Sequence, residues 1–69
     1  MAVFRIYLNG EPREVSSEFN IETLLEYFSL PKQLVAVELN NEVIRRQRWE
    51  STVVRADDKI EVVHFVGGG

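Results

Sequence analysis

The sequence predicts an α+β domain in which a mixed sheet of about five strands carries one helix across one face. An alternating segment at 3–8 and a strongly apolar run at 60–66 indicate strands near both ends of the chain. Between them, Ile21, Leu24, Leu25 and Phe28 follow the i, i+3, i+4, i+7 spacing of one helical face. With 69 residues, the chain has room for a single domain with a small core.

The composition excludes several classes of protein. Hydrophobic residues make up 45% and charged residues 28% of the chain, which is a globular rather than a disordered balance. The absence of cysteine excludes a disulfide framework, a thiolate metal site and a cysteine nucleophile. A net charge of −3, with no basic run beyond Arg45-Arg46, disfavours nucleic-acid binding.

Targeting signals are missing from the sequence as well. No charged and then apolar leader precedes the first strand, and no apolar run approaches the ~20 residues that span a bilayer. We therefore expect a soluble, cytoplasmic protein that does not bind membranes and is a monomer when free. We also expect no bound cofactor and no metal site.

The first thirty residues predict a hairpin and then the helix. The alternation of residues 3–8 runs into Asn9-Gly10, a pair that supplies the two positive-φ positions of a type I′ turn. The returning strand, residues 11–15, contains Pro12 and so belongs on a sheet edge. Asn20 is the predicted N-cap of the helix, and Pro31 is expected to end it.

The second half predicts three more strands. Residues 34–39 resume the two-residue period, Asn40-Asn41 suits a left-handed turn, and residues 42–44 form a short partner strand. Residues 45–51 are charged and irregular around Trp49, which is expected to cover an edge of the core. In the last strand, Ile60 and Val62 are predicted to face the core, and Val63 and Phe65 to face outward.

This order of elements is that of a β-grasp, with the first and last strands parallel and adjacent at the centre of the sheet. We divide the chain into a β-grasp domain, residues 1–66, and a flexible C-terminal glycine tail, residues 67–69. A tail of three glycines can be a frayed end or a remnant of cloning. It can equally be a device, because a terminal glycine is recognised only through its backbone and its carboxylate.

At this point the chain resembles the ThiS/MoaD family of ubiquitin-like sulfur carriers, and within it the ThiS branch most closely. The resemblance covers nearly the whole chain, from Asn9-Gly10 through the helix and the segments 36–49 and 58–63 to the glycines. Two positions depart from the family pattern, with Arg45 in place of proline and Asp57 in place of glycine. Both concern backbone stiffness, and neither touches the tail.

The resemblance implies a function for the tail. A ThiF-like enzyme would adenylate the carboxylate of Gly69 with ATP and Mg, and a sulfur donor such as a cysteine desulfurase would convert it to a thiocarboxylate. A ThiG-like thiazole synthase would then take the sulfur for thiamine biosynthesis. Gly68 and Gly67 would give the tail access to narrow active sites. The chain would be a carrier and not an enzyme, without catalytic residues of its own.

Other functions stay open at this point. The acceptor of the sulfur could be molybdopterin or a tRNA, the chain could be a ubiquitin-like modifier joined to lysines through Gly69, or the domain could be a plain interaction module. His64 could be a general base, but a lone strand histidine is more often structural. Asp57-Asp58 could suggest a metal site, although adjacent carboxylates in a turn are usually only solvated.

Partner docking is the remaining prediction. Parity places several side chains on the sheet face away from the helix, where we expect one contiguous apolar patch leading into the tail. We expect this face to bind both the activating enzyme and the synthase, and the basic cluster at 45–48 either to dock acidic partners or to be merely solvated. The predicted docking residues are Val63, Phe65, Tyr7, Val3, Arg5 and Arg46.

Overall fold

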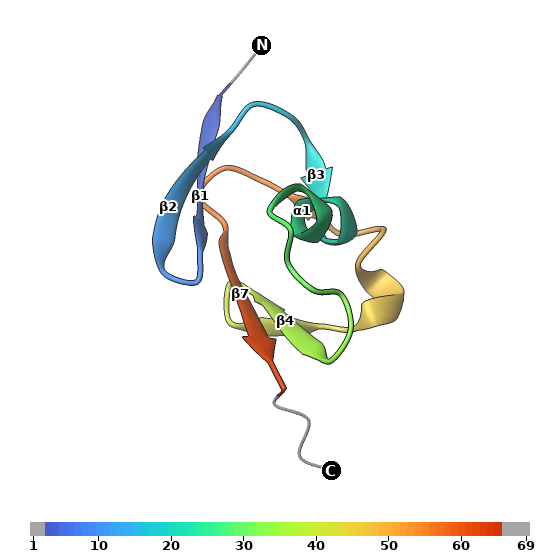
Figure 1. Ribbon diagram of the computed structural model, residues 1–69. Helices are drawn as coiled ribbons and strands as arrows, with labels where there is room; N and C mark the ends of the chain where they lie inside the picture. The colour runs from blue at the N-terminus through green and yellow to red at the C-terminus, as the bar shows by residue number, and fades with distance from the viewer. Residues whose placement is uncertain (1–2, 66–69) are drawn as a thin grey trace.

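The computed structural model describes residues 3–65. These residues form a five-stranded mixed sheet in the order β2-β1-β7-β4-β5, with the helix α1 packed on one face (Figure 1). No helix in this described part of the chain is long and apolar enough to cross a membrane. The elements are β1 (Phe4–Leu8), β2 (Glu11–Val15), β3 (Phe19–Asn20), α1 (Ile21–Tyr27), β4 (Val35–Leu39), β5 (Glu42–Ile44), the 3₁₀ helix η1 (Arg46–Arg48), β6 (Val53–Val54) and β7 (Lys59–His64).

The predicted β-grasp is confirmed. Strands β1 and β7 are parallel neighbours, and β7 occupies the centre of the sheet. The hairpin of β1 and β2 turns at Asn9 and Gly10, which have φ of 52° and 82°, as a type I′ turn requires. Pro12 lies on the edge strand β2, where its missing N–H breaks no ladder.

The helix begins as predicted and ends earlier than predicted. The Asn20 side chain accepts a hydrogen bond from the Thr23 N–H at 2.8 Å, and the Thr23 hydroxyl accepts one from the Asn20 N–H at 3.0 Å. The expectation that Pro31 ends the helix is wrong, because α1 stops at Tyr27. Ser29 has already entered the left-handed region, with φ of 57°, and no helix continues through that conformation.

The core lies between α1 and the sheet, and Trp49 belongs to it. The Trp49 side chain is only 2% exposed, so it fills the interior and does not merely cover an edge. Its Nε1–H donates to the Ile44 carbonyl at 2.9 Å, which satisfies the one polar atom of the buried ring. The buried residues are Ile6, Leu8, Val15, Ile21, Leu24, Leu25, Val35, Val37, Trp49, Val54 and Ile60.

A second, two-stranded sheet was not predicted from the sequence. Strands β3 and β6 pair antiparallel, with Phe19 opposite Val54 and Asn20 opposite Val53. The Ile21 N–H donates to both the Trp49 and the Thr52 carbonyls, at 3.2 and 3.1 Å. These contacts tie the start of the helix to the segment that follows η1.

Candidate functional site

The last strand leaves the sheet with a neighbour on only one side. Strand β7 pairs with β4 over five residue pairs, from Leu39 opposite Ile60 to Val35 opposite His64. It pairs with β1 only at its beginning, where Lys59 lies opposite Tyr7 and Ile60 lies opposite Leu8. Beyond Ile60, therefore, β1 has ended while β7 continues.

Two hydrogen bonds outside the strand ladders support this exit. The Asn9 side-chain oxygen accepts from the Val62 N–H at 2.8 Å, on the side that β1 has left. On the other side, the Phe65 N–H donates to the Leu34 carbonyl at 2.7 Å, one residue beyond the end of β7. The backbone is thus held as far as Phe65, the last residue that the structure describes.

Apolar side chains surround the exit. Leu34, Val63 and Phe65 are 60%, 47% and 53% exposed, and we call these three residues the exit patch. The outward orientation predicted for Val63 and Phe65 is confirmed. Leu34 was not predicted, because its φ of 59° breaks the alternation from which the sequence assigned faces.

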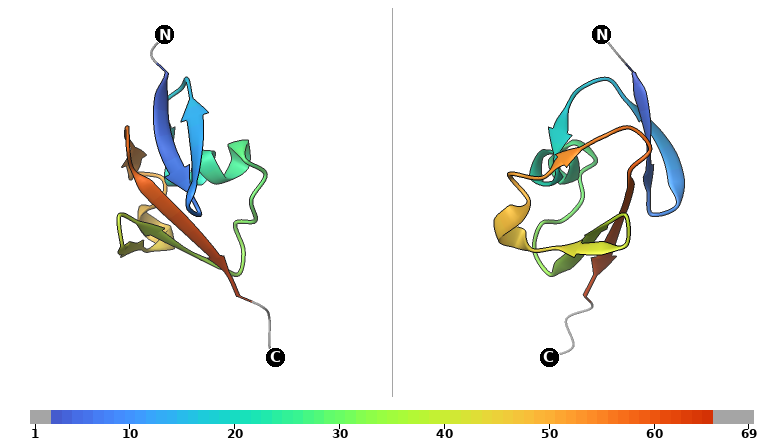
Figure 2. Two further views of the ribbon diagram at one scale, coloured as in Figure 1. Left: turned by 90° about the vertical axis from the view of Figure 1, so that its left-hand side faces the viewer. Right: turned by 180° about the vertical axis from the view of Figure 1, so that it is seen from behind.

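The expectation that the outward-facing docking residues form one contiguous apolar patch is wrong. Tyr7 lies beside Lys59, which precedes Val63 by four residues, or roughly 13 Å along the strand. Arg5 lies further back along β1 and Val3 directly precedes that strand, and the start of β1 and the end of β7 are at opposite ends of the sheet (Figure 2). Parity gave the correct face, but the register separates Val3, Arg5 and Tyr7 from the exit patch.

At the far end of the sheet, these outward residues have partners of their own. Arg5 lies 3.6 Å from Glu14 on the edge strand β2. A side-chain hydrogen bond with Tyr7, and then the Glu14 carboxylate, raise the pKa of Arg5 above its ordinary value. Their role in docking stays a prediction.

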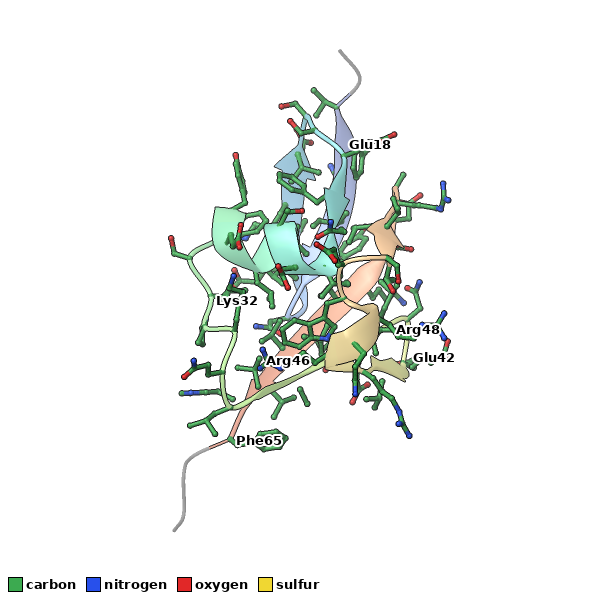
Figure 3. The ribbon with its side chains drawn as sticks, turned by 90° about the vertical axis from the view of Figure 1, so that its right-hand side faces the viewer. Glu18, Lys32, Glu42, Arg46, Arg48 and Phe65 are labelled. Atoms are coloured by element: carbon green, nitrogen blue, oxygen red, sulfur yellow. The ribbon has the colours of Figure 1, made fainter. Side chains whose placement is uncertain are left out.

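Arg46 braces the fold through two contacts of its guanidinium group. Its guanidinium carbon lies 4.6 Å from the centre of the Trp49 ring, within cation–π distance. The same guanidinium donates to the Lys32 carbonyl in the loop between α1 and β4. Figure 3 shows Arg46 directed toward Lys32, with Arg48 on the other side of η1. Its role in docking also stays a prediction.

The carboxylates considered for a metal site serve the turn before β7. Asp58 accepts hydrogen bonds from the Asn40 side chain at 3.0 Å and from the Arg55 N–H at 2.7 Å. Asp57 has φ of 67°, a conformation that aspartate tolerates better than most residues. No group of three His, Asp or Glu side chains with the geometry of a metal site is found among residues 3–65.

The residues predicted to carry the chemistry lie outside the described part of the chain. These are Gly67, Gly68 and Gly69, together with the predicted boundary between the domain and its tail. The structure therefore gives the platform from which residues 66–69 begin. That platform is the end of β7, held by Asn9 on one side and Leu34 on the other.

The fold and this exit define a class of protein, the β-grasp domains in which a central last strand leads directly into a glycine-ended segment. The model of the ThiS family matches residues 6–69. The chain belongs to the ThiS family, which confirms the resemblance seen in its sequence.

Similar proteins agree with this assignment. The chain is 43% identical over 65 residues to the sulfur carrier protein ThiS of Bacillus subtilis, covering 93% of this chain and 98% of that protein. It is similar to the crystal structure of the thiamine biosynthesis protein ThiS from Geobacter metallireducens, with a TM-score of 0.84 and 33% identity. That match covers 96% of this chain and all of the other.

A further relative is much longer than this chain. The chain is 43% identical over 65 residues to a thiazole synthase of Magnetococcus marinus, covering 94% of this chain. It spans only 20% of that relative's length. A segment similar to this chain is thus part of a larger polypeptide in that bacterium.

Proposed function

We propose that this protein carries sulfur for thiazole formation in thiamine biosynthesis, as a thiocarboxylate on Gly69. The observation that carries the proposal is the ThiS family match over residues 6–69, which includes all three terminal glycines. The geometry of the exit supports it, because the Phe65 N–H fixes the end of the central strand's path beside exposed apolar side chains. The four residues beyond Phe65 reach at most roughly 14 Å, enough to enter a partner's active site.

The chemistry needs two activation steps. A free terminal carboxylate has a pKa near ~3.5, so at neutral pH it is anionic and a poor electrophile. Transfer of AMP from ATP to the Gly69 carboxylate releases pyrophosphate and creates a good leaving group. The terminal sulfur of a persulfide then attacks the acyl carbon and displaces AMP, and a second thiol cleaves the acyl disulfide to release the thiocarboxylate.

The chain is a co-substrate in this scheme, and we assign it no catalytic residue. A ThiF-like adenylating enzyme binds ATP and Mg, and a cysteine desulfurase supplies the persulfide sulfur. Gly69 leaves its acyl carbon unobstructed because it has no side chain, and Gly68 allows backbone angles that other residues avoid. The exit patch of Leu34, Val63 and Phe65 contacts the partner that receives the tail.

A ThiG-like thiazole synthase is the acceptor that we favour. The Magnetococcus marinus thiazole synthase contains a segment similar to this chain. Linking a carrier to its acceptor raises their effective concentration without any new contact. That arrangement is useful only where the two parts react with each other, so it supports the same acceptor for this chain.

Mass spectrometry of the intact protein tests the proposal. After incubation with ATP, Mg, the adenylating enzyme, a desulfurase and cysteine, we expect one oxygen-for-sulfur exchange, located at Gly69. Thiazole formation should then follow when thiazole synthase and its other substrates are added. An isopeptide bond to lysine would support a protein modifier instead, and transfer only to molybdopterin or tRNA would support another carrier. An unmodified carboxylate under all these conditions would rule out sulfur carriage.

A further inference from the structure

Two arginines at the β5 edge of the sheet form no ion pair with a carboxylate among residues 3–65. Arg45 directly follows β5, and Arg48 ends η1. The ion pairs found among residues 3–65 use Arg5, Arg13 and Lys32. Two guanidinium groups beside the one carboxylate of Glu42 leave this edge locally positive in a chain of net charge −3.

These arginines line a groove with a mixed surface. The groove has a volume of about 380 Å³, and its apolar lining comes from Leu39, Val43 and Ile44. Arg45 and Arg48 supply its positive groups. Figure 3 shows Arg48 on the side of η1 that faces away from Arg46, so the brace formed by Arg46 leaves this groove open.

The groove runs along an edge of the sheet whose backbone is available. Strand β5 is the last strand of the sheet order, so its outer side has no strand partner among the described residues. Leu39 and Glu42 flank the two-residue turn and form a hydrogen-bonded pair, so the next pair, Glu38 and Val43, does not exchange ladder bonds. The N–H and C=O of Val43 therefore point away from β4, toward the open edge.

We propose that this groove binds a short extended segment of a partner protein that carries acidic side chains. The segment adds to the β5 edge through the Val43 backbone, and its carboxylates pair with Arg45 and Arg48. A segment that alternates acidic and apolar residues matches both the charge and the apolar lining. A phosphate ligand fits less well, because it would use neither the apolar lining of the groove nor the open backbone edge of β5.

This surface is separate from the reaction of the tail, so the two proposals can fail independently. The test uses the full chain, labelled with ¹⁵N, and an acetylated and amidated hexapeptide Ser-Glu-Val-Glu-Val-Ser. When the peptide is added, we expect chemical-shift changes centred on the amides of Val43, Arg45 and Arg48. The affinity for the peptide should fall as the salt concentration is raised. In the R45E/R48E variant we expect binding to be about tenfold weaker.

Matched controls make the result decisive. R55E reverses an exposed arginine outside the groove and should bind the peptide nearly as well as the wild type does. The neutral R45Q/R48Q variant should also weaken binding, and its amide spectrum reports directly on folding. The proposal is overturned if Val43 does not shift, if a peptide with Lys in place of Glu binds equally well, or if R45Q/R48Q binds undiminished. Equal shifts from inorganic phosphate alone would overturn it in favour of a simple anion site.

Discussion

The side-chain oxygen of Asn9 accepts a hydrogen bond from the Val62 N–H at 2.8 Å, across 53 positions of sequence. The Asn9 N–H donates to the Ile60 carbonyl, also at 2.8 Å. One turn residue therefore continues the hydrogen bonding of β1 at the point where that strand ends. The turn that closes the first hairpin also supports the strand that leads to the glycines.

Substitutions at Asn9 should separate its role as a hydrogen-bond acceptor from its role as a positive-φ turn residue. Asn9→Ala loses the acceptor and also places alanine at φ of 52°, so we expect a loss of about 2 kcal/mol in the free energy of unfolding. Asn9→Gly keeps the conformation and should lose about 1 kcal/mol, while Asn9→Asp keeps the acceptor and should lose least. Urea denaturation measures the stabilities, and amide exchange at Val62 measures the local effect. A glycine variant as stable as the wild type would show that the hydrogen bond contributes nothing.

Arg46 should contribute to stability more than its neighbour Arg48 does. Arg46→Ala removes both the stacking on Trp49 and the hydrogen bond to Lys32, and we expect a loss of about 1 kcal/mol. Arg46→Lys should recover little, because an ammonium group lacks the planar fork that makes both contacts. Arg48→Ala is the matched control and should stay within about 0.5 kcal/mol of the wild type. Tryptophan fluorescence during urea unfolding measures the stability of all three variants. Equal losses in the two alanine variants would show that the contacts of Arg46 do not stabilise the fold.

The exit patch should matter for binding more than the far end of the sheet does. Val63→Thr keeps the β-branched shape and Phe65→Ser removes the ring, and both side chains are about half exposed, so the domain should stay folded. We expect the double variant to bind the adenylating enzyme and thiazole synthase about tenfold more weakly. Val3→Thr is the control, since Val3 is also exposed, at 61%, but directly precedes β1 at the far end of the sheet. Calorimetric titration measures the affinities. If Val3→Thr weakened binding as much as the double variant does, the docking surface would extend over the whole sheet face.

The glycine before the terminus should affect reaction without affecting folding. Gly68→Val restricts the backbone and adds bulk beyond the described domain, so the unfolding midpoint should not change. Adenylation in a pyrophosphate-release assay should slow by about tenfold or more, because a displaced reacting atom carries a large penalty. Glu18→Val provides a control at a distant, exposed position and should react at the normal rate. A normal rate for Gly68→Val would show that the partner does not enclose this part of the tail.

Local sequence patterns predicted most of the fold. The Asn9-Gly10 turn, the Asn20 cap and the left-handed Asn40-Asn41 turn were all confirmed, with positive φ at each turn residue. Such features depend on the conformational preferences of a few adjacent residues, so they can be seen without the rest of the chain. The same holds for the face assignments of Ile60 and Val63, which follow from a period of two.

The sequence by itself thus determined the family, the glycine-ended segment and the faces on which the residues of β1 and β7 lie. Only the tertiary structure decided how far β7 runs past β1, and that offset separates Val3 from Val63. It also placed the Arg46 guanidinium against the Trp49 ring while leaving Arg48 beside a groove. The register of β1 against β7 depends on contacts between residues roughly 50 positions apart, and no local period encodes it.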